Sequence, residues 1–124
     1  MPSQFDLATA AEKISSFVKE RDWEQFQTPK NLVMAISGEV GELSEIFQWL
    51  SDEQASDLMD DANSRQAVCD EIADVQLYLI RLAQVLQVSI AESAEQKISK
   101  NIEKYPVSLC RGRSEKYTQL RSIS

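Results

Sequence analysis

The sequence has 124 residues but no histidine, and it contains only two cysteines. The absence of histidine excludes a histidine-based catalytic triad, a histidine general base and a histidine-ligated zinc or haem. Cys69 and Cys110 are too few for a zinc site and lie far apart in the sequence, so we expect two reduced thiols in a cytoplasmic protein. No stretch approaches the roughly 20 apolar residues that span a bilayer, and the N-terminus lacks the pattern of a signal peptide, so we expect no membrane association.

Glycine and proline are also scarce, with three of each. Because these residues interrupt helices, their scarcity predicts long helices joined by short turns. No strand-like alternation is present, and the hydrophobic content of 43% indicates a folded chain whose length fits one domain. We therefore predict an all-α, four-helix-bundle-like fold over residues 1–106, with a short extra helical segment, and a basic, serine-rich polar tail over residues 107–124.

Capping residues and prolines give the expected helix boundaries. Thr28 and Pro29 resemble an N-cap followed by proline at the first helical position. Asn63 or Ser64 is expected to cap the fourth segment, and Pro106 follows the end of the last. The expected helical segments are residues 6–21, 29–50, 51–61, 63–87 and 89–104, with residues 22–27 as a connector.

Charge is unevenly distributed along the chain, whose formal net charge is −7. Residues 97–124 carry 7 of the 13 basic residues but only 2 of the 20 acidic residues. An acidic body disfavours binding of duplex nucleic acid, so we expect no nucleic-acid partner. The same body suits cations, whereas the basic C-terminal part suits phosphates.

Two acidic side chains stand out on the expected helix 29–50. On a helical wheel with Leu32 at zero, Glu39 falls at about 340°, inside the apolar stripe, and Glu42 at about 280°, on one margin of it. Burial of an unpaired carboxylate is unfavourable, so a charge within the stripe is unusual. The other members of this stripe are Ile36, Leu43, Ile46 and Leu50.

The expected helix 63–87 repeats the pattern. Glu71 and Asp74 lie three residues apart on one margin of its stripe, so antiparallel packing of the two helices through their stripes would bring four acids together. Residues 38–50 and 69–80 contain no lysine or arginine to neutralise them. The expected counter-charge is therefore a hard divalent cation, Mg²⁺ with Mn²⁺ as a substitute, and the alternative is a solvated acidic face. The stripe is expected to contain Val68, Ile72, Val75, Leu79, Leu82 and Leu86.

Together, Glu39, Glu42, Glu71 and Asp74 resemble the ExxE…ExxD signature of the all-α nucleoside triphosphate pyrophosphohydrolases, the MazG-like superfamily. Further segments are similar to the dCTP pyrophosphatase branch, and the resemblance extends over about residues 5–118. These segments are residues 21–26, 31–32, 47–49, 78, 105–106 and 116–117.

The resemblance implies Mg-dependent hydrolysis of (d)NTP to (d)NMP and pyrophosphate in nucleotide pool sanitation, with dCTP or a related or modified pyrimidine dNTP as substrate. It implies that the four acids of the signature bind the metal. Because the chain has no histidine, the proton acceptor has to be a carboxylate or a metal-bound hydroxide. Glu39 is the first candidate, since burial raises its basicity, and Glu42 is the second.

The resemblance also implies which residues contact the base and the phosphates. Ile14 and Gln27 occupy positions where the dCTP branch can carry histidines. Lys97 and Asn101, on one side of the expected last helix with Lys104, are candidates to bind phosphates, and a solvated basic face is the alternative. Arg111, Arg113 and Lys116 in the tail are similar candidates. The residues matching the family's base-contacting positions are Trp23, Glu24, Gln25, Phe26, Gln27, Trp49 and Tyr78, for whose aromatic members ordinary packing is the alternative.

Apolar residues cover a wide arc of the expected helix 29–50, more than one bundle needs, which indicates that the chain is not a monomer. The family resemblance implies a homotetramer, a dimer of dimers. Two other functions stay open: a non-catalytic acidic helical protein-interaction module, and a phosphohydrolase that releases orthophosphate. The arc contains Leu32, Val33, Ile36, Val40, Leu43 and Phe47.

Overall fold

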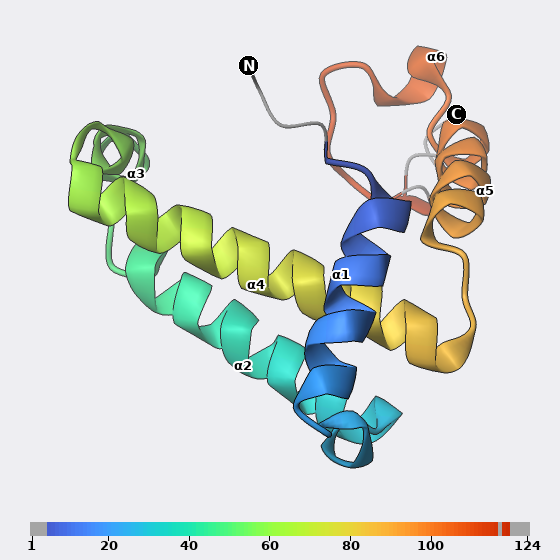
Figure 1. The fold of residues 1–124 in the computed structure, drawn as a ribbon. Coiled ribbons are helices and arrows are strands. Elements are labelled where there is room, and N and C mark those ends of the chain that lie inside the picture. Colours follow the sequence, from blue (N-terminus) through green and yellow to red (C-terminus); the bar gives the residue numbers. More distant parts are fainter. Residues whose placement is uncertain (1–4, 117, 120–124) are drawn as a thin grey trace. The chain divides into compact units, whose positions relative to one another are not determined.

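The computed structural model describes residues 5–116, 118 and 119, and the regular elements in these residues are all helices. The predicted all-α class is thereby confirmed. Four helices are long: α1 (Leu7–Glu20), α2 (Pro29–Phe47), α4 (Ala62–Leu86) and α5 (Ile90–Lys104) (Figure 1). The short elements are η1 (Glu24–Phe26), α3 (Asp52–Asp57), η2 (Leu58–Asp60) and α6 (Val107–Cys110).

Side-chain caps begin most of these helices at the expected residues. The Asp6 carboxylate accepts a hydrogen bond of 2.7 Å from the Thr9 N–H at the start of α1. The Thr28 hydroxyl accepts from the Asn31 N–H at the start of α2, where Pro29 is the first helical residue. Such caps satisfy amide donors that the first turn of a helix leaves without a partner.

The beginning of α4 and the end of α2 differ from the predictions. The cap of α4 is Asp61 rather than Asn63 or Ser64, because the Asp61 carboxylate accepts both the Ser64 N–H and the Ser64 hydroxyl at 2.9 Å. Helix α2 ends at Phe47, three residues before Leu50. The predicted polar tail begins with the short helix α6.

Helices α2 and α4 run antiparallel along most of their length, and α1 packs against α4 near its C-terminal half (Figure 1). The residues buried between these helices are small or aliphatic, as expected for a helical core. They are Ala10, Val18, Leu32, Val68 and Ile80.

The apolar stripe predicted for α4 is only partly correct. Val68 is buried, but Ile72, Leu79 and Leu86 are 56%, 41% and 51% exposed, and the second buried residue is Ile80. The periodicity of α4 predicts an apolar face, but the packing of α1 and α2 against this helix determines which part of that face is buried.

The chain forms two compact units, residues 1–88 and residues 89–124. Helices α1 to α4 belong to the first unit, and α5 and α6 to the second. The predicted boundary at residue 106 stays a prediction. Within the described residues, no helix is both long and apolar enough to cross a membrane.

Candidate active site

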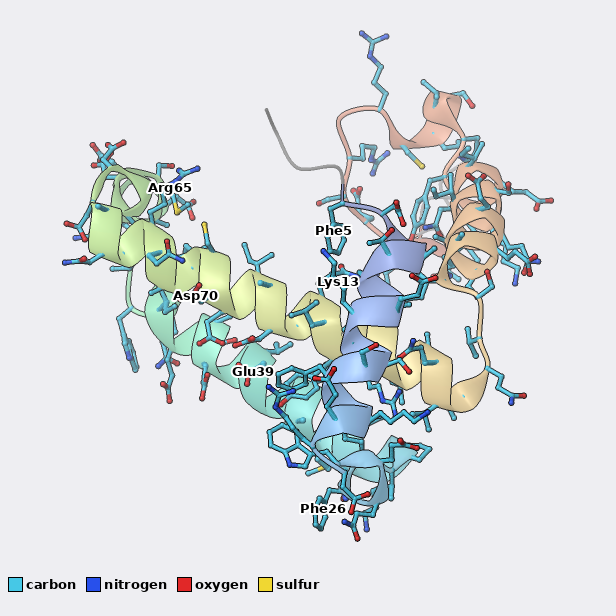
Figure 2. The ribbon with its side chains drawn as sticks, viewed as in Figure 1. Phe5, Lys13, Phe26, Glu39, Arg65 and Asp70 are labelled. Atoms are coloured by element: carbon cyan, nitrogen blue, oxygen red, sulfur yellow. The ribbon has the colours of Figure 1, made fainter. Side chains whose placement is uncertain are left out.

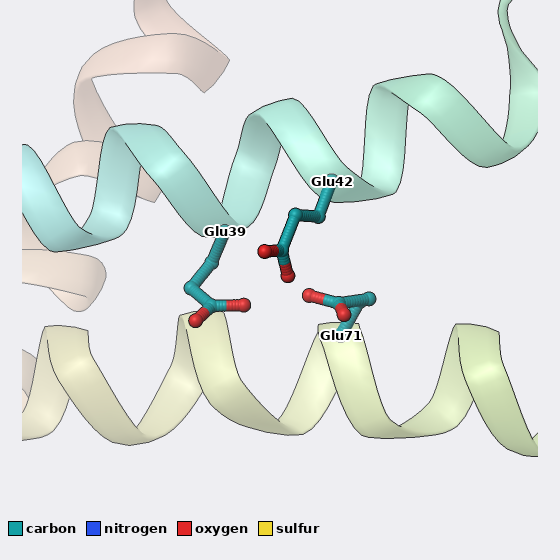
Figure 3. A group of neighbouring side chains, drawn as sticks. All are labelled: Glu39, Glu42 and Glu71. Atoms are coloured by element: carbon teal, nitrogen blue, oxygen red, sulfur yellow. The ribbon is translucent and has the colours of Figure 1, made fainter.

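Three carboxylates meet between α2 and α4 (Figure 3). Glu39 and Glu42 lie one turn apart on α2, and Glu71 faces them from α4. One carboxylate oxygen from each lies within 4.8 Å of the others. The antiparallel packing expected from the sequence therefore brings three of the four predicted acids together.

Asp74, the fourth predicted acid, lies one turn after Glu71 on α4 but outside this group of three. It lines the same cavity as Glu39. Its role as a metal ligand stays a prediction.

The electrostatics of the group are unfavourable without a counter-ion. Oε2 of Glu39 and Oε2 of Glu71 are buried and have no hydrogen-bond partner among the described residues. The adjacent carboxylate of Glu39, burial, and the adjacent carboxylate of Glu42 raise the pKa of Glu71 from 4.5 to about 7, because all three favour a protonated Glu71. Neither ion pair found in the described part of the chain involves these acids, since both lie at Arg21–Glu20 and Arg113–Glu115.

This donor set fits a hard divalent cation. It offers carboxylate oxygens alone, two of them buried without a donor, and it has negative charge to neutralise. Mg²⁺ and Mn²⁺ prefer such oxygen ligands. Glu39, Glu42 and Glu71 are therefore the residues that could hold the ion.

A cavity of about 560 Å³ opens beside the acids within the first unit. Glu39 and Asp74 lie in its wall, and α1 supplies much of the remaining surface. Figure 2 shows Phe5 and Lys13, two of the lining residues, on the α1 side of the unit. Its aromatic and aliphatic lining includes Ile14, Phe17, Val18, Trp23, Leu77 and Tyr78.

Only some of the predicted base-contacting residues line the cavity. Trp23, Gln27 and Tyr78 line the cavity, as does Ile14. Trp23 packs edge-on against Phe17, with ring centroids 5.6 Å apart. The cavity lining does not include Glu24, Gln25, Phe26 or Trp49.

Phe26 and Trp49 are neither core nor cavity residues in this chain. Phe26 is 62% exposed at the end of the unit (Figure 2), and Trp49 is 85% exposed just beyond α2. Trp23 and Trp49 flank opposite ends of α2, so one chain does not bring them onto the same base. The predicted role of Trp49 in base binding stays a prediction.

The predicted phosphate-binding residues belong to the second unit. Lys97 and Asn101 lie exposed on α5, and Arg113 is paired with Glu115 at 2.8 Å. Their contact with phosphate stays a prediction, as it does for Lys104, Arg111 and Lys116.

Sequence reasoning missed two cationic residues of the cavity, Lys13 and Arg81. Arg81 follows Tyr78 by three residues and Asp74 by seven, so all three lie on one face of α4. This spacing indicates from the sequence alone that Arg81 shares a helix face with two of the predicted site residues. The position of Lys13 depends on where α1 crosses α4, which local periodicity does not determine.

Comparison with known proteins agrees with this geometry. The sequence profile of the MazG-like family matches residues 34–120, which include Glu39, Glu42, Glu71 and Asp74. The chain belongs to the MazG-like family. It is 43% identical over 106 residues to dCTP pyrophosphatase 1 of Mus musculus and 42% identical over 106 residues to that of Homo sapiens. Each match covers 86% of the chain but 62% of the relative, so the chain spans less than two thirds of the length of these relatives.

A solved structure is also similar to the chain. The crystal structure of a pyrophosphatase from Archaeoglobus fulgidus has a TM-score of 0.77 and 34% sequence identity with it. The match covers 86% of this chain and 97% of that one, so the likeness extends over nearly the whole archaeal structure.

Proposed function

We propose that the protein is a metal-dependent nucleoside triphosphate pyrophosphohydrolase that converts (d)NTP and water to (d)NMP and pyrophosphate. The observation that carries this proposal is the placement of Glu39, Glu42 and Glu71 beside a cavity of about 560 Å³. Pockets for small ligands span about 300–1,000 Å³. The similarity to proteins named dCTP pyrophosphatase 1 supports the same reaction.

Glu39 is the proposed proton acceptor and Glu42 the second candidate. Glu39 is half-buried, and its Oε2 has no donor among the described residues, so it is available to an attacking water. As the water oxygen attacks the α-phosphorus, Glu39 accepts the proton and the α–β bridging bond breaks, releasing pyrophosphate. A bound Mg²⁺ would offset the negative charge that develops on the triphosphate oxygens.

The proposed substrate is dCTP or a related or modified pyrimidine dNTP, and the proposed role is cytoplasmic nucleotide pool sanitation. The base would enter the cavity beside Trp23 and Tyr78, whose rings can stack on it. The identity to the mammalian dCTP pyrophosphatases supports this substrate class.

The proposed assembly is a homotetramer, a dimer of dimers. Aliphatic side chains are exposed on both long helices of the site, which supports burial against another copy. Val33 and Val40 on α2 are 51% and 44% exposed, and Ile72 and Leu79 of α4 are similarly accessible.

A panel of canonical and modified (d)NTPs, with separate measurement of NMP, pyrophosphate and orthophosphate, tests the reaction. We expect NMP and pyrophosphate in equal amounts with Mg²⁺ or Mn²⁺, and no turnover in excess EDTA. Calcium should bind but support little turnover, because its coordination is looser. Release of orthophosphate would indicate a different phosphohydrolase. Full turnover in EDTA would refute the proposal. No turnover with any metal would also refute it and would favour the protein-interaction module.

A further inference from the structure

Arg81 lies in the cavity wall and donates hydrogen bonds to two glutamine side chains. Its Nε donates to Oε1 of Gln27 at 2.9 Å, just before α2, and its Nη1 donates to Oε1 of Gln84 at 3.2 Å. Gln84 in turn donates from Nε2 to the Ala11 carbonyl oxygen of α1 at 2.8 Å. The guanidinium is therefore fixed in orientation by a network rather than free to move on a flexible stem.

The charge of Arg81 is not neutralised by this network. Arg81 is half-buried, and within the described residues it makes no ion pair. Both of its partners are amide oxygens, which accept hydrogen bonds without adding negative charge. Buried charges in proteins are generally paired, so a fixed, half-buried guanidinium facing a cavity is suited to a ligand acceptor.

The donors that remain have a defined geometry. Guanidinium carries five N–H groups in a planar fork and no acceptor. Nη2 makes no hydrogen bond to any described residue, and Nη1 has a second N–H. Arg81 can therefore offer parallel donors to two adjacent acceptors, but it cannot accept from an amino group.

The distance from the acids agrees with a contact to the base. Arg81 lies seven residues after Asp74 on α4, a rise of about 10 Å along the helix. A nucleotide whose phosphates bind at the acids would extend its base past Tyr78 and towards Arg81, since all of these groups line one cavity.

We propose that Arg81 is a specificity-determining residue that donates hydrogen bonds to two adjacent acceptors on the base of the nucleotide, with Gln27 and Gln84 as its positioning residues. This proposal rests on the proposed function. N3 and O2 of cytosine are adjacent acceptors, as are N7 and O6 of guanine. Uracil, thymine and adenine have a donor or a C–H beside each acceptor, so Arg81 favours cytosine or guanine nucleotides over those of the other bases.

The experiment compares kcat/KM for dCTP, dGTP, dUTP, dTTP and dATP in four forms of the full chain: wild type, Arg81→Met, Arg81→Lys and Arg65→Met. Arg65 is the matched control, an exposed arginine near the start of the same helix and remote from the cavity (Figure 2). Arg81→Met removes the donors, whereas Arg81→Lys keeps the charge but loses the fork. Circular dichroism and melting temperature establish that the variants fold.

We expect the wild type to prefer dCTP or dGTP. Whichever of these two substrates has the higher kcat/KM identifies the base that Arg81 binds. Arg81→Met should lower kcat/KM for the preferred substrate by roughly tenfold or more, mainly through KM, and change the values for dUTP and dATP by less than about twofold. Arg81→Lys should lose most of the discrimination, and Arg65→Met none. An equal loss on all five substrates, or retained discrimination in both Arg81 variants, would overturn the proposal.

Binding of the monophosphates dCMP, dGMP and dUMP in EDTA, measured by calorimetry, separates this proposal from the proposed function. If wild type hydrolyses no dNTP, the proposed function fails, but the loss of base discrimination in Arg81→Met can still be measured. If wild type hydrolyses dNTPs and Arg81→Met binds the three monophosphates with wild-type ratios, the role of Arg81 fails while the proposed function remains.

Discussion

Glu71 faces two carboxylates across the contact between α2 and α4, and the repulsion between these like charges raises its pKa. The adjacent Glu39 carboxylate, burial and the nearby Glu42 carboxylate raise this pKa to about 7. Below about pH 7, the protonated form of Glu71 is therefore favoured in the folded, metal-free chain. A cation would favour the charged form instead, so the acids stabilise a metal complex more than they stabilise the fold.

In EDTA, we expect the free energy of unfolding to fall as the pH rises from about 4.5 to about 7. Over this interval the folded chain holds a proton on Glu71 that the unfolded chain has lost, so stability is highest below 4.5 and the contribution is gone above 7. Asp6 and Asp61, whose pKa values are lowered by hydrogen bonds from Thr9 and Ser64, lose stabilisation only as the pH falls towards and below 3.8.

Urea denaturation at a series of pH values measures this slope. Glu71→Gln should flatten it, because glutamine does not titrate. Glu45→Gln is the matched control, since Glu45 is exposed on α2 outside the acid group and should leave the slope unchanged. Identical slopes for wild type and Glu71→Gln would show that titration of Glu71 does not contribute to the pH dependence of the free energy of unfolding.

Glu39→Gln should abolish turnover while leaving the stability of the metal-free chain equal or higher. The substitution keeps the shape of the side chain but removes the proposed proton acceptor and one of the repelling charges. The measurements are kcat with Mg²⁺ and the melting temperature in EDTA, again with Glu45→Gln as control. A strongly destabilised Glu39→Gln would indicate a structural role for this carboxylate.

At the scale of helices, the boundaries predicted from caps were mostly correct because capping is local. Thr28, Ser51 and Ser89 cap helices at the expected places. The cap of α4 was wrong because aspartate, asparagine and serine occur together at residues 61–64, and all three are good caps. The helical wheel likewise placed Glu39, Glu42 and Glu71 correctly on facing sides of α2 and α4.

The cap of α2 offers a test at this scale. Thr28→Ala should lower the free energy of unfolding by about 1 kcal/mol, because the Asn31 N–H loses its acceptor. Thr28→Ser keeps a hydroxyl and should retain most of the stability. Equal stability of the alanine and serine variants, measured by urea denaturation, would contradict a capping role for this side chain.

At the scale of the whole chain, local patterns did not determine the cavity. Its lining depends on where α1 meets α4, which brings Lys13 and Ile14 towards Tyr78 and Arg81. Ile72, Leu79 and Leu86 of the apolar stripe predicted for α4 are likewise exposed rather than buried. Long-range packing, which has no periodic signal, accounts for both differences.

The exposed row on α4 leads to the last prediction. Ile72, Leu79 and Leu86 recur every seven residues, so they form a continuous strip rather than scattered exposed side chains. Burial of this strip against another copy would remove it from water. We therefore expect light scattering after size-exclusion chromatography to give a mass four times the 14.0 kDa of the chain.

Leu79→Glu, which places a charge in the middle of the strip, should shift the protein to smaller species and lower its melting temperature, because an unpaired charge is unfavourable in an apolar interface. Ser16→Glu adds the same charge at an exposed polar position of α1 and should leave the mass unchanged. A wild-type mass equal to one chain, or an intact assembly in Leu79→Glu, would show that α4 does not mediate association.

Dissociation should also lower turnover, because Leu79 is next to Tyr78 on the helix that carries Glu71. Serial dilution of the wild type should reproduce this loss of turnover.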